Sequence, residues 1–264
     1  MQEKDYIEEL PNGAQLEMVH VEGGRFMMGS ENGYEDERPI HEVNVPDFYI
    51  GKYPITNEQF VPFLNEKGNQ KEGGIEWVNI EGEYEGVRSG IVHDEDGFTC
   101  IPELKKHPMI YVSWNGARAY CQWLSEKIEK NYRLPSESEW EYAAKGGKNI
   151  NGYKYVGSNK LKEVGWYREN SHEELKAVGM RFPNELKLYD MSGNVWEWCI
   201  DQWNITYNGS FQGGRDWGER AEENLRVIRG GAWNSDSSSC LSIERNWRRI
   251  DNGSSNLGFR IARY

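Results

Sequence analysis

The sequence predicts a single α+β domain in which strands come first, helices lie in the middle and irregular β structure fills the rest. Three observations support this class. Apolar and polar residues alternate near the N-terminus, an apolar stripe with helical spacing occupies the centre, and short apolar runs between Gly and Trp residues follow. The chain also contains 29 Gly, 11 Trp and 15 Tyr. Because each aromatic ring buries a large area, aromatic packing can stabilise a domain with little regular structure.

Strand patterns open the chain. Residues 16–22 alternate with the period of a half-buried strand, and Gly23-Gly24 predicts a turn into a second strand, RFMMGS, so that the two would form a hairpin. Residues 41–49 alternate again. Residues 66–100 are acidic and rich in Gly, and we expect an insertion or a loose pair of hairpins there.

Helix signals occupy the middle of the chain. The Thr56–Gln59 pair forms a capping-box pattern that predicts a helix start. The strongest helix follows, because apolar residues recur at steps of three and four over residues 114–128, with Ser113 as the candidate N-cap. A second capping box, Ser136–Glu139, opens a shorter helix that Gly146-Gly147 ends.

Composition excludes several classes of protein. The net charge of −12 makes the interaction with phosphate backbones and anionic membrane surfaces repulsive, so we expect no nucleic-acid partner. No stretch approaches the roughly 20 apolar residues that a transmembrane helix needs. The cysteines form no CxxC pair, and two disulfides or four buried thiols both stay open. They are Cys100, Cys121, Cys199 and Cys240.

Seven segments carry a resemblance to a known family. They run in order from about Leu16 to Tyr264 and read VEGGRFMMGS, PDFYIGKYPITNEQF, HPMIYVSWNGARAYCQWL, YRLPSESEWEYAAKGG, YDMSGNVWEW, RVIRGGAW and NLGFRIARY. In this order they resemble the formylglycine-generating enzyme, or sulfatase-modifying factor, family. The resemblance implies one domain over residues 1–264 with a C-type lectin-like fold, which has few regular elements, two main helices and a twisted antiparallel sheet.

The resemblance also shows where catalysis is lost. Enzymes of this family use two cysteines, placed after a GGSY or GGSW segment, to hold copper and activate oxygen. The matching segment here is Gly230-Gly231-Ala232-Trp233, with Ser235 at the first cysteine position and Cys240 at the second. Because Cu(I) requires soft thiolate ligands, which a serine hydroxyl cannot replace, we expect no copper and no formylglycine chemistry.

Other catalytic centres also lack support. A second catalytic branch of the family, which forms sulfur–carbon bonds, uses histidine ligands for iron. The histidines here show no HxH or HxxxE pattern, so we expect isolated surface or loop histidines and no iron. Ser235 and Ser239 lie in no GxSxG elbow, which argues against a nucleophilic triad. The five histidines are His20, His41, His93, His107 and His172.

A calcium site is the one metal centre with physical support. Residues 189–197 place two carboxylates around a Gly-containing turn, and Ca²⁺ takes carboxylate, backbone and water oxygens. The resemblance implies a structural calcium held by the side chains of Asp190 and Glu197 and the backbone oxygens of Gly193 and Val195. The alternative is that the two carboxylates accept backbone N–H groups or pair with an arginine.

The C-terminal residues 227–263 form a framed segment. Two apolar anchors, RVIRGGAW and NLGFRIARY, enclose residues 234–256, which we expect to be displayed at the surface. Loops on a rigid scaffold concentrate binding residues, and Trp247-Arg248-Arg249 combines the side chains that interface hot spots favour. The core-facing residues of the anchors would be Val227, Trp233, Phe259 and Ile261.

The framed segment resembles that of variable proteins, whose genes are diversified by retroelements that mutate adenines in a repeated template. Such proteins use a C-type lectin fold to vary one ligand-binding surface. The resemblance rests on the anchor spacing and on the Asn, Ser and Asp residues between the anchors. The candidate diversified, ligand-binding positions are Asn234, Ser235, Asp236, Ser238, Ser239, Asn246, Trp247, Arg248, Arg249, Ser254, Ser255 and Asn256.

The sequence therefore predicts a non-catalytic binding protein. We expect a monomer with a macromolecular ligand, a protein or a glycan, because a shallow displayed surface favours one. An oxygen-dependent enzyme with an altered active site and a structural accessory domain stay open as alternatives. The first residues lack the regions of a secretion signal. We expect a cell-surface or extracellular protein whose signal or lipid anchor lies outside this sequence, and a cytoplasmic location stays open.

Overall fold

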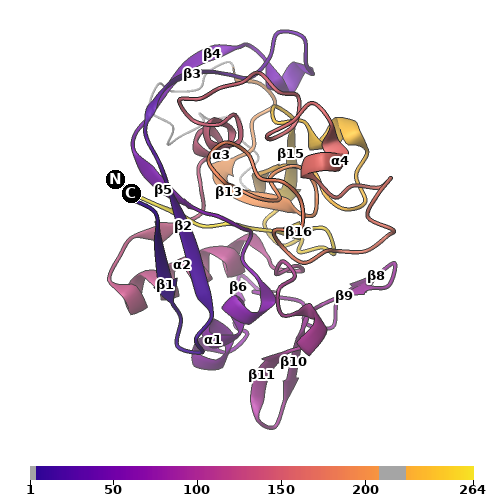
Figure 1. Ribbon diagram of the computed structural model, residues 1–264. Helices are drawn as coiled ribbons and strands as arrows, with labels where there is room; N and C mark the ends of the chain where they lie inside the picture. The colour runs from indigo at the N-terminus through magenta and orange to yellow at the C-terminus, as the bar shows by residue number, and fades with distance from the viewer. Residues whose placement is uncertain (1–3, 208–223) are drawn as a thin grey trace.

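The computed structural model describes residues 4–207 and 224–264, with two main sheets and a group of helices (Figure 1). One sheet has five antiparallel strands in the order β1-β2-β5-β17-β12. The other has four strands in the order β15-β14-β13-β16. Within the described residues, antiparallel sheets and short helices confirm the predicted α+β class.

The five-stranded sheet brings the N-terminal and C-terminal parts together. The C-terminal strand β17 lies between β5 and β12, and the Arg263 Nε donates to the Tyr6 hydroxyl near the N-terminus. The alternating pattern of residues 16–22 is confirmed as a strand. The strands are β1 (Tyr6–Glu9), β2 (Gln15–Val21), β5 (Phe48–Gly51), β12 (Tyr132–Arg133) and β17 (Ala262–Arg263).

The predicted hairpin between residues 16–22 and RFMMGS is wrong. β3 (Gly24–Met28) pairs with β4 (His41–Val45), whereas β2 pairs with β1 and β5. The chain bends at Gly23 without reversing, since Val21 pairs with Phe48 and Gly24 pairs with Val45. The bend requires glycine, because a Cβ there would lie 2.5 Å from the backbone of Pro46. The chain segments on the two sides of this ladder, residues 15–28 and 41–51, bend at the same place and stay paired before and after it. A Gly-Gly pair in the sequence alone does not distinguish such a bend from a turn.

The predicted helix starts are confirmed. The Ser136–Glu139 capping box forms in both directions, the Gln59 side chain accepts the Thr56 N–H at 2.9 Å, and the Ser113 Oγ accepts the Gly116 N–H at 3.1 Å. A fourth helix, α4 (Leu161–Val164), carries no sequence signal because one turn is too short for a periodic pattern. The other helices, α1 (Asn57–Lys67), α2 (Trp114–Ile128) and α3 (Glu137–Ala144), begin directly after Thr56, Ser113 and Ser136.

Residues 66–100 form three small hairpins, where the sequence predicted an insertion or a loose pair. The hairpins are β6 (Lys71–Glu72) with β7 (Ile75–Glu76), β8 (Glu83–Tyr84) with β9 (Val87–Arg88), and β10 (Ile91–Asp94) with β11 (Gly97–Cys100). The hairpins of β8–β9 and β10–β11 project from the lower right of the molecule in Figure 1, whereas β6 lies beside α1. The short 3-10 helices are η1 (Glu35–Glu37), η2 (Pro102–Leu104) and η3 (Ser237–Cys240).

The four-stranded sheet carries the framed segment. Its strands are β13 (Trp196–Gln202), β14 (Leu225–Arg229), β15 (Arg245–Arg249) and β16 (Leu257–Gly258). β14 pairs antiparallel with β13 and β15, while β16 runs parallel to β13 at the opposite edge. As predicted, the four core-facing residues of the anchors are buried. They are Val227, Trp233, Phe259 and Ile261.

Aromatic packing holds the core. Phe60 stacks on Tyr120 with ring centroids 5.3 Å apart, and Tyr120 meets Phe259 edge to face at 5.6 Å. Helix α1, helix α2 and the C-terminal anchor are thereby joined, as the high aromatic content predicts. No helix within residues 4–207 and 224–264 is both long and apolar enough to cross a membrane.

Candidate binding surface

The first position of the family's cysteine pair has a structural role here. The Ser235 Oγ accepts the Ala232 N–H at 3.0 Å, and the Ser235 carbonyl accepts the Arg168 N–H at 3.1 Å. The hydroxyl therefore stabilises the turn that follows the Gly230-Gly231 pair. It has neither the charge nor the softness that a copper ligand needs.

The second position, Cys240, is buried. Its side chain packs in a small apolar cluster with Leu161, Val164 and Tyr167, and burial raises the pKa of the thiol to about 12. Gly231 makes this close approach feasible, since a Cβ there would lie 2.5 Å from the Cys240 sulfur. A neutral, buried thiol is a poor nucleophile and a poor metal ligand.

Thiol reactivity tests this description of the cysteines. In the native protein we expect a thiol reagent to modify Cys100 alone, slowly, because Cys121, Cys199 and Cys240 are buried as free thiols. Burial raises the pKa of all four thiols. After denaturation all four should react. Fast modification of Cys240 in the folded protein, located by mass spectrometry, would contradict the burial described above.

Two of the five histidines lie in one cavity although they are far apart in the sequence. His107 and His172 line one cavity of about 810 Å³ together with Glu103, Glu173 and Glu174. Burial and the nearby Lys176 lower the pKa of His107. Within the described residues no group of three or more His, Cys, Asp or Glu side chains has a metal-binding arrangement. The iron site remains unsupported, although the histidines are not all isolated.

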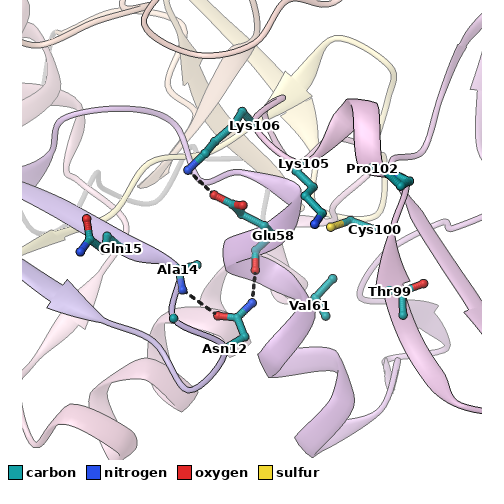
Figure 2. A pocket seen from close by; sticks show the side chains of 11 residues that line it. Asn12, Ala14, Gln15, Glu58, Val61, Thr99, Cys100, Pro102, Lys105 and Lys106 are labelled. Carbon is teal, nitrogen blue, oxygen red and sulfur yellow. Dashed lines mark hydrogen bonds and ion pairs between the residues drawn. The ribbon is translucent and has the colours of Figure 1, made fainter.

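A second cavity, of about 500 Å³, lies between the β1–β2 turn, helix α1 and residues 99–106 (Figure 2). Asn12 joins two of its walls, since its Nδ2 donates to the Glu58 carbonyl at 2.8 Å and its Oδ1 accepts the Ala14 N–H at 3.2 Å. Lys106 pairs with the Glu58 carboxylate at 2.5 Å. None of the predicted site residues lines this cavity.

Glu197, a predicted calcium ligand, forms an ion pair. Its two oxygens accept the Arg260 Nε at 2.6 Å and Nη2 at 2.7 Å, and the Trp140 Nε1 donates to the same carboxylate at 2.7 Å. All three side chains are buried. The guanidinium neutralises Glu197 and would repel a second cation, so this side chain fits the arginine-pair alternative rather than a calcium ligand.

Asp190, the other predicted carboxylate ligand, differs from Glu197. Its Oδ2 accepts the Gly179 N–H at 2.7 Å, whereas its Oδ1 is buried without a hydrogen-bond partner among the described residues. Burial raises the pKa of Asp190 to about 6. A buried carboxylate oxygen without a partner is what a bound cation would satisfy. The calcium site therefore stays a prediction, with Asp190 as its best-supported side chain.

The loop that carries these residues also positions the framed segment. The Gly193 N–H donates to the Gly230 carbonyl at 2.7 Å, and the Asn194 carbonyl accepts the Trp233 N–H at 2.9 Å. Gly193 has φ +88°, and a Cβ there would lie 2.1 Å from the Trp166 carbonyl oxygen. With Val195 buried beside it, this loop holds the first anchor in place whether or not it binds calcium.

A buried charge network supports the framed segment from below. Arg229 pairs with Glu141 and donates to the Ile243 and Glu244 carbonyls at 2.9 and 2.7 Å. Arg245 pairs with Glu137 at 2.6 Å, and the side chains of both ion pairs are fully buried. Residues 242–245, in the middle of residues 234–256, are thus tied to helix α3 by two arginines. The sequence shows no sign of these pairs, whose members lie far apart along the chain.

The predicted binding residues fall into two groups. The first, which we call the loop patch, comprises residues 234–239 and 254–256. Asn256 Nδ2 donates to Asn234 Oδ1 at 2.9 Å, and Arg168 pairs with Asp236 at 2.6 Å. Asp236 and Ser238 are exposed, while the other members except Ser255 are partly buried. Ser255 is buried, 4% exposed, so its side chain is not displayed.

The second group, which we call the strand patch, comprises residues 246–249 on β15. Trp247 is 41% exposed and Arg249 is exposed, while Asn246 and Arg248 are partly buried. Because side chains alternate along a strand, Trp247 and Arg249 lie on one face and Asn246 and Arg248 on the other. β15 and β16 are the opposite edges of the four-stranded sheet, so the two patches are separated by its width.

An apolar cavity adjoins the framed segment and was not predicted. It has about 520 Å³, and Ile243 from the segment lines it together with Phe26, Met27, Ile150 and Tyr153. Met27, Ile150 and Tyr153 are exposed by 40% or more. An apolar residue, Ile243, within a polar segment is the one signal that the sequence offers for it. These residues come from three distant segments, which explains why sequence spacing does not reveal the cavity.

A family model matches nearly the whole chain. The model for the sulfatase-modifying factor enzyme 1-like domain covers residues 3–264. The serine/threonine-protein kinase Pkn1 of Chlamydia trachomatis is 36% identical over 96% of this chain and 39% of the kinase. The chain therefore spans about two fifths of the length of such kinases.

Other relatives match over most of their length. The inactive Cα-formylglycine-generating enzyme 2 of Bos taurus is 31% identical over 96% of this chain and 90% of the relative. The formylglycine-generating enzyme of Streptomyces coelicolor is 30% identical over 92% and 88%. Among solved structures, Treponema denticola variable protein 1 aligns with a TM-score of 0.75 at 25% identity, covering 98% of this chain and 99% of that protein.

Proposed function

We propose that this chain, which belongs to the sulfatase-modifying factor enzyme 1-like family, is a non-catalytic domain that binds a macromolecule through the framed segment. Its fold is the C-type lectin-like fold of that family, as the sequence predicts. The family contains enzymes and an inactive relative, so fold alone does not decide between catalysis and binding. The decision rests on the site.

The observation that carries the proposal is the contrast between the anchors and the residues between them. Val227, Trp233 and Phe259 are at most 1% exposed, while Trp247, which lies opposite Val227 on the neighbouring strand β15, is 41% exposed. Large side chains are thus presented on a support that tolerates little movement. Surface substitutions on such a support change the free energy of unfolding by about 0.5 kcal/mol or less, so the displayed residues can vary without loss of fold.

The absence of catalysis is supported by the cysteine positions. Ser235 accepts a backbone N–H, and Cys240 is buried with a raised pKa. A copper site of the family's type would need two accessible thiolates at these positions. We therefore expect the purified protein to contain no stoichiometric copper.

Diversification by a retroelement is the finer part of the proposal. The likeness to a variable protein over 98% of the chain supports it, as does the Asn, Ser and Asp content of the loop patch. A near-duplicate of the DNA encoding residues 227–263, differing only at adenines and adjacent to a reverse-transcriptase gene, would establish it. If the chromosome lacks such a repeat, diversification by a retroelement is rejected, and the proposed binding function still has to be tested separately.

The ligand proposed is a protein or glycan outside the cell. Trp247 and Arg249 lie on one face of an edge strand, and such a flat face suits a large partner better than a small molecule. The apolar cavity beside Ile243 would accept an apolar side chain of that partner.

A binding array tests the proposal. The native domain and a Trp247→Ala variant are applied to printed arrays of glycans and of purified cell-surface proteins. For the array member that the native domain binds, we expect Trp247→Ala to weaken binding by about 2 kcal/mol or more, roughly thirtyfold. The unfolding free energy should fall by about 1 kcal/mol or less, because the side chain is 41% exposed.

Phe182→Ala provides the matched control. Phe182 is an exposed aromatic, 73% accessible, that lies outside the framed segment. It should bind the array member as the native domain does. Equal binding by native domain and Trp247→Ala would reject the strand patch as the binding surface. A Trp247→Ala variant that loses its cooperative melting transition would place that side chain in the core instead.

A further inference from the structure

The register of β15 against β14 determines which backbone N–H and C=O groups of β15 point away from β14, toward the outer edge of the sheet. The Ile250 N–H donates to the Asn224 carbonyl at 2.9 Å, so residues 224 and 250 form a hydrogen-bonded pair at the end of the β14–β15 ladder. In an antiparallel pair, hydrogen-bonded residues alternate with residues whose N–H and C=O point away from the partner strand. Asn246 and Arg248 therefore face β14 with their backbone. The backbone groups of Trp247 point outward.

Both outward groups of Trp247 are already bonded, and its two neighbours supply the bonds. The Trp247 N–H donates to Asn246 Oδ1 at 2.8 Å, and the Trp247 carbonyl accepts Arg248 Nη1 at 3.1 Å. Within residues 4–207 and 224–264, no strand other than β14 pairs with β15. Two side chains thus occupy the positions where the backbone of an added strand would bond.

We propose that Asn246 and Arg248 block the outer edge of β15 against pairing with another extended chain. An open edge strand is a template for strand addition, and proteins cover or charge such edges to prevent it. Trp247 lies at the centre of the edge and is 41% exposed, so an uncovered edge here would combine free backbone groups with an apolar side chain. Because the side chains of Asn246 and Arg248 bond the Trp247 N–H and carbonyl, these backbone groups are no longer free to pair, while the indole stays exposed.

The consequence for recognition rests on the proposed function. With its edge blocked, β15 contacts a partner through the Trp247 and Arg249 side chains and not by adding a strand. Specificity then depends on side chains alone, as a diversified surface requires. The block itself can be tested without any partner, so its failure and the failure of the proposed function are separate results.

The test compares the native chain with an Asn246→Ala/Arg248→Ala variant. The occupant expected at the unblocked edge is a second copy of this chain, with two β15 strands paired about a two-fold axis centred on Trp247. Sedimentation velocity over a concentration series should show a monomer for the native chain and a monomer–dimer equilibrium for the variant. Circular dichroism and thermal melting establish that both are folded.

A proline at the centre of the edge is the matched control. Adding Trp247→Pro to the double variant removes the outward N–H without touching the β14 ladder, since Pro is tolerated on the free side of an edge strand. The triple variant should return to a monomer. Dimers that persist with the proline, or a folded double variant that stays monomeric at every concentration, would overturn the proposal.

Amide exchange provides an independent readout in the single variant. In Asn246→Ala the Trp247 amide should exchange roughly fivefold faster, because a hydrogen bond of about 1 kcal/mol is lost. The Arg248 amide, which faces β14, should be unchanged. An unchanged Trp247 exchange rate would overturn the proposal even if the double variant did not fold.

Discussion

An Arg229→Met variant is expected to lose about 3–5 kcal/mol of unfolding free energy, because it removes a buried cation and leaves Glu141 with Lys145 alone and Glu137 with Arg245 alone. Arg229 and its partners Glu137 and Glu141 are all 0% exposed in their side chains. Arg229 also donates to the carbonyls of Ser242, Ile243 and Glu244. Met keeps much of the volume, so the loss reports the charge and the hydrogen bonds rather than a cavity.

Chemical denaturation monitored by tryptophan fluorescence measures this loss. The matched control is Arg25→Met, since Arg25 pairs with Glu42 at 3.4 Å while the two side chains are 72% and 60% exposed. An exposed pair contributes about 1 kcal/mol or less, so the control should unfold almost as the native protein does. Equal losses in the two variants would show that the Arg229 network is solvated and not buried.

A compensating change separates charge from packing. In an Arg229→Met/Glu141→Leu variant the buried carboxylate leaves together with its cation, and part of the lost stability should return. Lys145, which pairs with Glu141 at 2.7 Å and is 17% exposed, can then turn to solvent. If the double variant is less stable than Arg229→Met alone, the network's carboxylates contribute more through other bonds than through Arg229.

The local elements were predictable because their signals are local. The N-caps Thr56, Ser113 and Ser136 each lie within a few residues of the groups they bond, so a capping pattern suffices. The bend at Gly23 was not predictable in the same way. Its conformation depends on the backbone of Pro46, which the fold brings against it from a paired strand.

The site was predictable as a segment but not as a surface. The anchor residues that the sequence predicts to face the core are buried, so residues 234–256 are framed by two fixed strands as expected. The sequence does not reveal that Ser255 is buried or that Trp247 and Arg248 face opposite sides of a strand. Those facts follow from the register of β15 against β14, which is set by long-range pairing.

The arginine partner of Glu197 was likewise left open by the sequence. An arginine was one of two alternatives for this carboxylate, but its identity as Arg260 depends on β16 lying parallel to β13. This pairing brings the second anchor against the start of β13. The same pair therefore fastens the far end of the framed segment, as Arg229 fastens the near end.

An Arg260→Met variant is accordingly expected to lose about 3–5 kcal/mol as well, since the buried Glu197 carboxylate would be left with the Trp140 N–H alone. Arg260 also donates to the Gly51 and Tyr189 carbonyls, both at 2.8 Å, so these backbone groups lose a partner too. Denaturant unfolding measures the loss. Pairing the change with Glu197→Gln should recover part of it, because the uncompensated charge is removed.

The same variant distinguishes arginine from calcium at this carboxylate. If Arg260 is the sole counter-ion of Glu197, the native melting temperature should be the same in calcium and in EDTA. If calcium also binds through Asp190, whose Oδ1 has no hydrogen-bond partner in the part of the chain that the structure describes, calcium should raise the native melting temperature by mass action. Arg260→Met frees the second carboxylate and should then strengthen the calcium effect. A loss below about 1 kcal/mol in Arg260→Met without added metal would contradict the buried pair itself.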